Sequence, residues 1–207
     1  MVGRLLVLKE NETCVVLDAE GGTVGATTAG IYRRDTRFIS EWHWVVASAQ
    51  ILQCGTHEDV LLQRLAIKHN QVVTALLERR LTVRSDGFDE HWQVRSTASA
   101  AQEIRLDLSL QADGRDLFAA LSEVARELLP PAGMTKHYSP GSRTLQLSRT
   151  ASDGVVLSVA LTAVPEDLSW TFALTPGELI EFDLAVNVSS TDDSGESAPL
   201  PPYAQWR

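Results

Sequence analysis

The sequence is poor in cysteine, and it contains no long apolar runs. Only two cysteines, Cys14 and Cys54, occur among the 207 residues, and they form no CxxC pair. The pattern therefore indicates neither a disulfide framework nor a zinc site, and we expect both thiols to be small buried side chains. No stretch approaches the roughly 18 apolar residues of a membrane helix, and the first apolar run is too short for a signal peptide. We expect a soluble, cytoplasmic protein.

Positive charge is also scarce. The chain has 18 lysines and arginines against 27 aspartates and glutamates, which gives a formal net charge of -9. Binding to a nucleic acid or to an anionic membrane would lack an electrostatic driving force. We therefore expect neither of these partners.

The common sequence signatures of catalysis and cofactor binding are missing. The glycine-rich stretch from Ala19 to Gly30 matches neither GxGxxG nor GxxxxGK[ST], which excludes the usual nucleotide-binding motifs. No HxH, HExxH or GxSxG spacing occurs, so the sequence predicts no metal site and no standard nucleophile. We predict no catalytic residue, no metal and no cofactor in this chain.

The most distinctive stretch runs from Gly30 to Val46, GIYRRDTRFISEWHWVV. Arginines crowd around Asp35 directly before a long strand, and we predict that Arg34 and Arg37 clamp the Asp35 carboxylate and hold it ionised. Alternation predicts that one face of the strand carries Phe38, Trp42, Trp44 and Val46, with Ile39, Glu41, His43 and Val45 on the other.

Two roles stay open for this charged stretch. It could be an ion-pair network that only anchors a loop, or it could bind a polar or anionic partner, since rigid charged loops at the ends of sheets often carry function. The candidate substrate-binding or interface residues are Tyr32, Arg34, Asp35, Thr36 and Arg37.

Most of the remaining chain has the alternating pattern of antiparallel strands. Val72–Arg84 also has a short helical spacing, but Asp86-Gly87 between two apolar runs favours a β-hairpin. The other predicted strands are Arg4–Lys9, Thr13–Asp18, Gln50–Gln53, Val60–Ile67, Gln102–Gln111, Thr144–Ser148, Val155–Leu161, Ser169–Leu174 and Leu179–Val188.

A single helix is predicted over Asp113–Leu129, with an apolar stripe and with Asp113 as its cap, followed by a loop from Ala132 to Gly141. About a dozen strands with one helix predict a mainly β fold, a two-sheet antiparallel sandwich of the supersandwich type. We assign residues 1–188 to this domain and the acidic, Ser/Pro-rich residues 189–207 to a linker. The tryptophans at strand spacing could stack on sugar rings, although a place in the core is the more common role.

The run GIYRRDTRFISEWHW resembles the RDTR stretch of the N-terminal domain of bacterial glycogen debranching enzyme-like proteins, the amylo-α-1,6-glucosidase group. Arg34 to Phe38 fall on the specific motif, and looser similarity covers nearly the whole chain. The resemblance implies a β-sandwich that precedes an (α/α) barrel, which carries the catalytic carboxylates and is not part of these residues. Ala119-Ala120-Leu121 departs from the family pattern after Asp116-Leu117-Phe118.

The resemblance implies a non-catalytic N-terminal domain of a debranching-type α-glucosidase, a glycoside hydrolase as a whole. Its expected partners are the catalytic barrel, on its own or a partner chain, and an α-glucan oligosaccharide whose cleft it helps to shape. A free-standing carbohydrate-binding module is one alternative. A structural sandwich that forms homo-oligomers is another.

Overall fold

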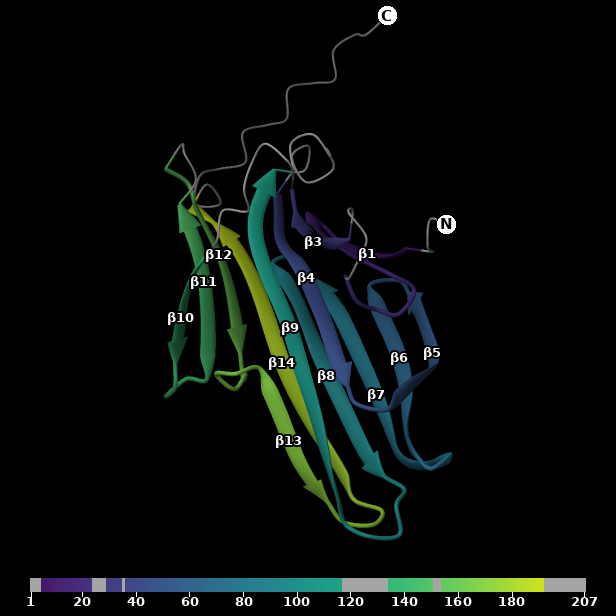
Figure 1. Ribbon diagram of the computed structural model, residues 1–207. Coiled ribbons are helices and arrows are strands. Elements are labelled where there is room, and N and C mark those ends of the chain that lie inside the picture. The colour runs from purple at the N-terminus through teal and green to yellow at the C-terminus, as the bar shows by residue number, and fades with distance from the viewer. Residues whose placement is uncertain (1–4, 24–28, 35, 117–133, 151–153, 192–207) are drawn as a thin grey trace, which may run out of the picture.

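The computed structural model describes residues 5–23, 29–34, 36–116, 134–150 and 154–191. Within these residues the protein is an antiparallel β-sandwich, as the sequence predicts, with two sheets packed face to face (Figure 1). The six-stranded sheet contains, in spatial order, β1 (Leu6–Glu10), β2 (Thr13–Leu17), β3 (Gly30–Arg33), β4 (Thr36–Val46), β9 (Gln102–Asp116) and β13 (Ser169–Leu174).

The second sheet has eight strands. In spatial order they are β10 (Thr135–Ser139), β11 (Thr144–Thr150), β12 (Val156–Thr162), β14 (Leu179–Ser190), β8 (Gly87–Ser96), β7 (Val72–Arg84), β6 (Val60–His69) and β5 (Ala49–His57). The long strands β4 and β9 of the first sheet cross in front of β14, β8 and β7 in Figure 1.

Aromatic side chains from both sheets fill the core. Trp44 of β4 lies with its ring centroid 5.0 Å from that of Trp92 of β8 and 4.9 Å from that of Trp170 of β13. Phe182 of β14 stacks on both Trp92 and Trp170. All four tryptophans in the described part of the chain are buried, which confirms their core role and leaves no exposed tryptophan platform there for a sugar.

The hairpin between β7 and β8 confirms the choice of strand over helix for Val72–Arg84. Gly87 follows the turn residues Ser85 and Asp86 as the first residue of β8, has a φ of 155° and packs against β14. A Cβ atom at this position would lie 1.9 Å from the backbone oxygen of Val186. No side-chain motion can relieve that contact, because the opposing atom belongs to the backbone of a neighbouring strand.

We therefore expect Gly87→Ala to lower the free energy of unfolding by about 2 to 3 kcal/mol, the upper part of the range for overpacked sites. Urea denaturation of the purified chain measures this change. Gly55→Ala is the matched control, because a Cβ there meets no atom within 4 Å, and its effect should stay within about 0.5 kcal/mol. Equal stability of the two variants would contradict the close packing of Gly87 on β14.

Several local predictions need correction. The predicted helix does not begin at Asp113, because β9 continues through Asp116; residues 117–129 lie outside the described residues. Thr135–Ser139 forms β10 within the predicted loop, and among the described strands it pairs only with β11, at the edge of the sheet. The final strand, β14, reaches Ser190, so the first two residues assigned to the linker belong to the sheet.

The predicted faces of β4 are also partly wrong. Ile39 is fully buried in the core, although strict alternation places it on the opposite face from Phe38. The pairing of β4 with β9 shifts register between Arg37 and Ile39 and again between Ile39 and Glu41. Such bulges interrupt the two-residue period, so neighbouring side chains on both sides of the shift can point inward.

Candidate functional site

The predicted charged loop joins β3 to β4. Tyr32 and Arg37 pair across the two strands and are both buried, while Thr36 is half-buried at the start of β4. Arg34 lies in the turn with a φ of 53°, and its side chain is exposed. Asp35 lies outside the described residues. The fold therefore brings Tyr32 and Arg37 together inside the sandwich and directs Arg34 toward solvent.

Arg37 forms a buried ion pair with Asp113 of β9. The Nη2 and Oδ2 atoms are 2.5 Å apart, and the exposed fractions of the two side chains are only 4% and 8%. Burial opposes the charge on Arg37, but the hydrogen bond and the charge of Asp113 outweigh it, so the pKa of Arg37 is raised. Burial also raises the pKa of Tyr32, which hydrogen-bonds to Arg37. The Arg37–Asp113 ion pair thus anchors the β3–β4 loop from inside the sandwich.

Among the described residues, the partners of Arg34 and Arg37 thus include side chains that are distant in the sequence. Arg34 donates from Nε to Glu12 at 2.9 Å, and its backbone N–H donates to the Glu12 carbonyl at the same distance. The predicted clamp on Asp35 stays a prediction. Instead of capping a helix, Asp113 accepts hydrogen bonds from Arg37, and its carbonyl accepts one from Arg149 of β11 at 3.0 Å.

A second buried charge lies deeper, on Glu90 of β8, which is completely inaccessible to solvent. Three indole N–H groups donate to its carboxylate: Trp42 at 2.8 Å, Trp44 at 2.7 Å and Trp92 at 3.2 Å. Arg79 of β7 donates from both Nε and Nη2 to the same carboxylate. Because Trp42 and Trp44 belong to the other sheet, Glu90 ties the two sheets together.

Arg79 connects this network to the loop between β2 and β3. Its Nη1 donates to the carbonyl of Gly21 at 2.7 Å and to Oε1 of Gln63 at 3.3 Å. Gln63 in turn donates to the carbonyl of Glu20 at 2.5 Å. The glycine-rich loop is therefore held over the core by two buried polar side chains of the eight-stranded sheet.

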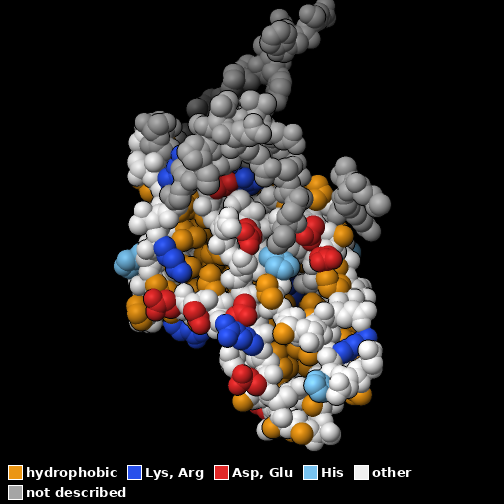
Figure 2. Space-filling view, in the orientation of Figure 1, with side chains coloured by type: hydrophobic (Ala, Val, Ile, Leu, Met, Phe, Trp, Pro, Cys, Tyr) orange, Lys and Arg blue, Asp and Glu red, His pale blue; other side chains and the backbone are white. Residues whose placement is uncertain are grey.

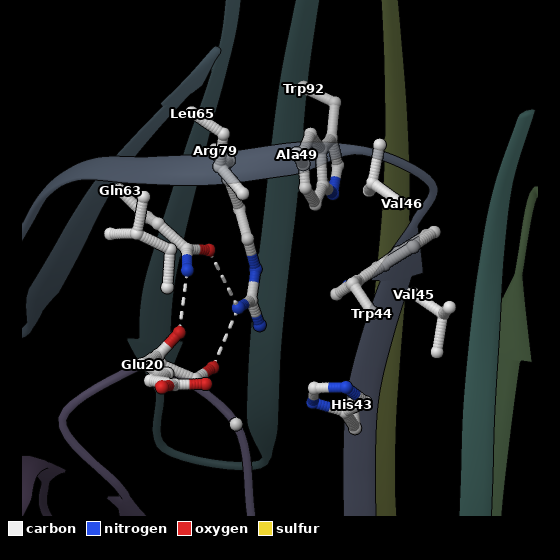
Figure 3. Close-up of a pocket in the computed structure, with 13 residues that line it drawn as sticks. Glu20, His43, Trp44, Val45, Val46, Ala49, Gln63, Leu65, Arg79 and Trp92 are labelled. Atoms are coloured by element: carbon white, nitrogen blue, oxygen red, sulfur yellow. Dashed lines mark hydrogen bonds between the residues drawn. The ribbon is translucent and has the colours of Figure 1, made fainter. Parts of the chain in front are cut away.

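A pocket of about 210 Å³ opens beside these groups (Figure 3). Arg79 and Gln63 stand on one side of it, and His43 and Trp44 stand on the other. The described lining is formed by Glu20, Gly21, Gly22, His43, Trp44, Val45, Val46, Ala49, Ile51, Gln63, Leu65, Arg79 and Trp92. The pocket thus lies where the loop, β4 and the β5–β8 part of the larger sheet meet.

A family model described as the N-terminal domain of (some) glycogen debranching enzymes matches residues 8–185. The chain belongs to this family. The resemblance drawn from the RDTR stretch is thereby confirmed. No curated protein matches the sequence.

Solved structures share the fold of this debranching-enzyme N-terminal domain at very low sequence identity. A galactose mutarotase related enzyme from Lactobacillus acidophilus has a TM-score of 0.51 and 7% identity, with 91% of this chain and 98% of that chain covered. A putative aldose 1-epimerase from Escherichia coli K12 has a TM-score of 0.50 and 9% identity, with 90% and 99% covered. At such identities the likeness extends to the fold alone.

The outer face of the eight-stranded sheet carries exposed leucines. Leu76 of β7 and Leu179 of β14 both lie opposite Arg95 of β8, so the three side chains form one row across the sheet. Leu52 is 56% exposed, Leu76 41% and Leu179 39%. Together with Arg64, Glu78 and Gln93 they line a groove of about 350 Å³, which we call the leucine face.

The side of the molecule shown in Figure 2 is notable for its pattern of charged side chains. Acidic and basic side chains are interspersed there, so this side of the molecule presents no large area of a single charge.

Within the described residues no group of three or more His, Cys, Asp or Glu side chains is placed to hold a metal ion. Across that same part of the chain, no helix has the length and apolar character needed to cross a bilayer.

Both cysteines are free and only partly buried, so the prediction of buried thiols is too strong. Burial is nevertheless sufficient to raise the pKa of each thiol, which disfavours the reactive thiolate.

Sequence analysis missed the residues that form the pocket and its support. A signal for two of them exists, however. Glu90 lies between Phe88 and Trp92 at the inward positions of an alternating strand, and Arg79 occupies the same parity as Leu77 and Leu81. Opposite charges at inward positions of neighbouring strands indicate a buried ion pair, since either charge alone would be costly.

Proposed function

We propose that this chain is a non-catalytic module of a debranching-type α-glucosidase. It docks to the glycosidase domain through the leucine face and forms one wall of the α-glucan cleft. The family match over residues 8–185 carries the proposal, because the family is defined as one domain of larger enzymes. A domain of this kind needs a surface that fits its neighbour.

The chemistry of the buried carboxylates supports a non-catalytic role. A carboxylate has about four lone-pair positions, and Glu90 already accepts hydrogen bonds from three indoles and from Arg79. Asp113 accepts both Nε and Nη2 of Arg37. Carboxylates fixed in this way stabilise the sandwich and are poorly suited to exchange protons with a substrate.

The leucine face has the composition of a docking surface. Exposed leucines alternate there with polar side chains: Arg95 lies between Leu76 and Leu179, and Arg64, Glu78 and Gln93 belong to the same lining. A partner would therefore meet apolar area and hydrogen-bonding groups together, as in other protein interfaces. The Arg64–Glu78 ion pair, with an Nε–Oε2 distance of 2.8 Å, already fixes two of these polar side chains. Covering Leu52, Leu76 and Leu179 would remove three exposed aliphatic side chains from water.

A matched pair of variants tests the docking surface. Leu52 and Val7 are both 56% exposed, but Val7 lies in β1 of the other sheet. We expect Leu52→Asp to weaken association with a separately produced glycosidase domain of the debranching type at least about tenfold, because a carboxylate would be desolvated in the interface. Val7→Asp should leave the affinity unchanged. Sedimentation velocity of the mixtures measures both.

Equal affinity of both variants would contradict docking through the leucine face. The non-catalytic role is tested separately, by incubating the chain alone with an α-1,6-linked glucan and measuring released glucose. We expect no turnover, and clear turnover would overturn the assignment.

The candidate residues Tyr32, Arg34, Asp35, Thr36 and Arg37 have a place in this proposal. Tyr32 and Arg37 act from inside by fixing the β3–β4 connection, whereas Arg34 is exposed and can meet a partner. The carbohydrate-binding alternative through exposed tryptophans is disfavoured, since Trp42, Trp44, Trp92 and Trp170 are buried. The homo-oligomer stays a prediction.

A further inference from the structure

We infer that the pocket beside Arg79 binds a single neutral, hydroxylated ring, namely one glucose unit of an α-glucan. The inference deepens the proposed function, on which the choice of sugar rests. The pocket and the groove of the leucine face share Leu65 in their linings, but Ala49 and His43 line the pocket only, and Leu52 and Leu179 line the groove only.

Size sets the first limit on the ligand. A volume of about 210 Å³ lies below the roughly 300 to 1,000 Å³ that is typical of pockets for drug-sized ligands. A single six-membered ring with its substituents matches a pocket of this size better than a dinucleotide or a peptide helix does. The pocket is therefore suited to a small ring or to one end of a chain of rings.

The polar groups of the pocket are fixed in advance. Arg79 and Gln63 are 1% and 4% exposed, and hydrogen bonds to Glu90 and to the loop carbonyls hold both side chains in place. Of the five N–H donors of a guanidinium, four are used by contacts within the described chain. A ligand would meet these groups without first ordering them, which lowers the entropic cost of binding.

The loop that forms one rim is equally ordered. Asp18 Oδ1 accepts the backbone N–H groups of Glu20 at 2.8 Å and Gly22 at 3.0 Å. A Cβ on Gly22 would lie 2.9 Å from Nδ1 of His43, so only glycine lets the loop approach the imidazole this closely. Glu20 and His43 thus stand at the rim, where a carboxylate and an imidazole can hydrogen-bond to hydroxyl groups.

The charge balance selects a neutral ligand. The positive charge of Arg79 is offset by the buried Glu90, and the exposed Glu20 adds a negative charge at the rim. A phosphate or carboxylate would enter against this field. The apolar part of the lining includes Val46, Ala49 and Ile51, and these aliphatic side chains suit the C–H groups of a sugar ring.

The test is a calorimetric titration of the full chain with D-glucose, isomaltose and maltotriose at millimolar concentrations, with glucose 6-phosphate as the anionic comparison. We expect the neutral sugars to bind and the phosphate ester to bind more weakly. Ala49→Phe fills the pocket and should reduce sugar affinity about tenfold or more. His43→Ala removes a hydrogen-bonding rim group without adding volume, and it should also weaken binding, by a smaller factor of several-fold.

Each result has a definite meaning. No heat with any neutral sugar, unchanged affinity in both variants, or tighter binding of glucose 6-phosphate would each overturn the inference. Leu52→Asp serves as the folded control and should bind sugar like the unaltered chain. We expect Leu52→Asp to lose docking but keep sugar binding, and Ala49→Phe to lose sugar binding but keep docking. Because the two readouts are measured separately, failure of the pocket can be told from failure of the proposed docking function.

Discussion

Replacement of Glu90 by glutamine should lower the free energy of unfolding by about 4 to 5 kcal/mol, the upper end of the range for a broken buried ion pair. Glutamine keeps the shape of glutamate but removes its charge, so the Arg79 guanidinium would be buried without a counter-ion. The amide nitrogen would also face an indole N–H, whichever way the side chain is turned. Urea or thermal denaturation measures the loss.

The same strands supply the control. Arg64 and Glu78 form an ion pair between β6 and β7 on the outer face, where the exposed fractions of their side chains are 52% and 38%. Glu78→Gln should change stability by no more than about 1 kcal/mol, as is usual for solvent-screened pairs. A loss below about 1 kcal/mol for Glu90→Gln as well would contradict the role assigned to the buried carboxylate.

We expect Arg37→Ala to cost about 3 to 4 kcal/mol, since it leaves the carboxylate of Asp113 buried without its cation. The truncation also removes a hydrogen-bonding partner of Tyr32. The melting temperature and the midpoint of urea denaturation should both fall.

A neighbour in the same motif provides the comparison. Arg34 is paired with Glu12, but both side chains are more than 40% exposed. Arg34→Ala should therefore change stability by less than about 1 kcal/mol. If the two alanine variants were equally stable, the anchoring of the β3–β4 loop by Arg37 would have to be abandoned.

Sequence patterns predicted the sandwich because most strands have one buried and one solvated face. The β7–β8 hairpin was predictable from Asp86-Gly87 between two apolar runs. The close contact of Gly87 with Val186 was not, because the two residues are far apart in the sequence. Local turn chemistry is visible in a sequence, whereas the strand that will pack over the turn is not.

The partner of Arg37 illustrates a second limit. Aspartates are close in sequence at position 35 and distant at position 113, and only the pairing of β4 with β9 brings the distant one to the guanidinium. The apparent helix start at Asp113 reflected helical spacing in the residues after it. The continuation of β9 and the ion pair with Arg37 determine the conformation of Asp113 instead.

Pocket residues were hidden for a related reason. Gly21, His43, Gln63 and Arg79 come from four separate segments, and none carries a motif by itself. Inward parity identifies Arg79 and Glu90 as buried, but it does not say that three tryptophans share the carboxylate. That arrangement depends on how the two sheets face each other.

The carboxylate shared between the sheets also affects how the sandwich deforms. Contacts between hydrocarbon side chains have no fixed direction, so apolar packing alone specifies the offset of two packed sheets less sharply than hydrogen bonds do. Here a slip of one residue along β4 would carry Trp42 and Trp44 away from Glu90 and break both directional bonds at once. The domain should therefore transmit a load applied at one sheet to the other as a stiff body.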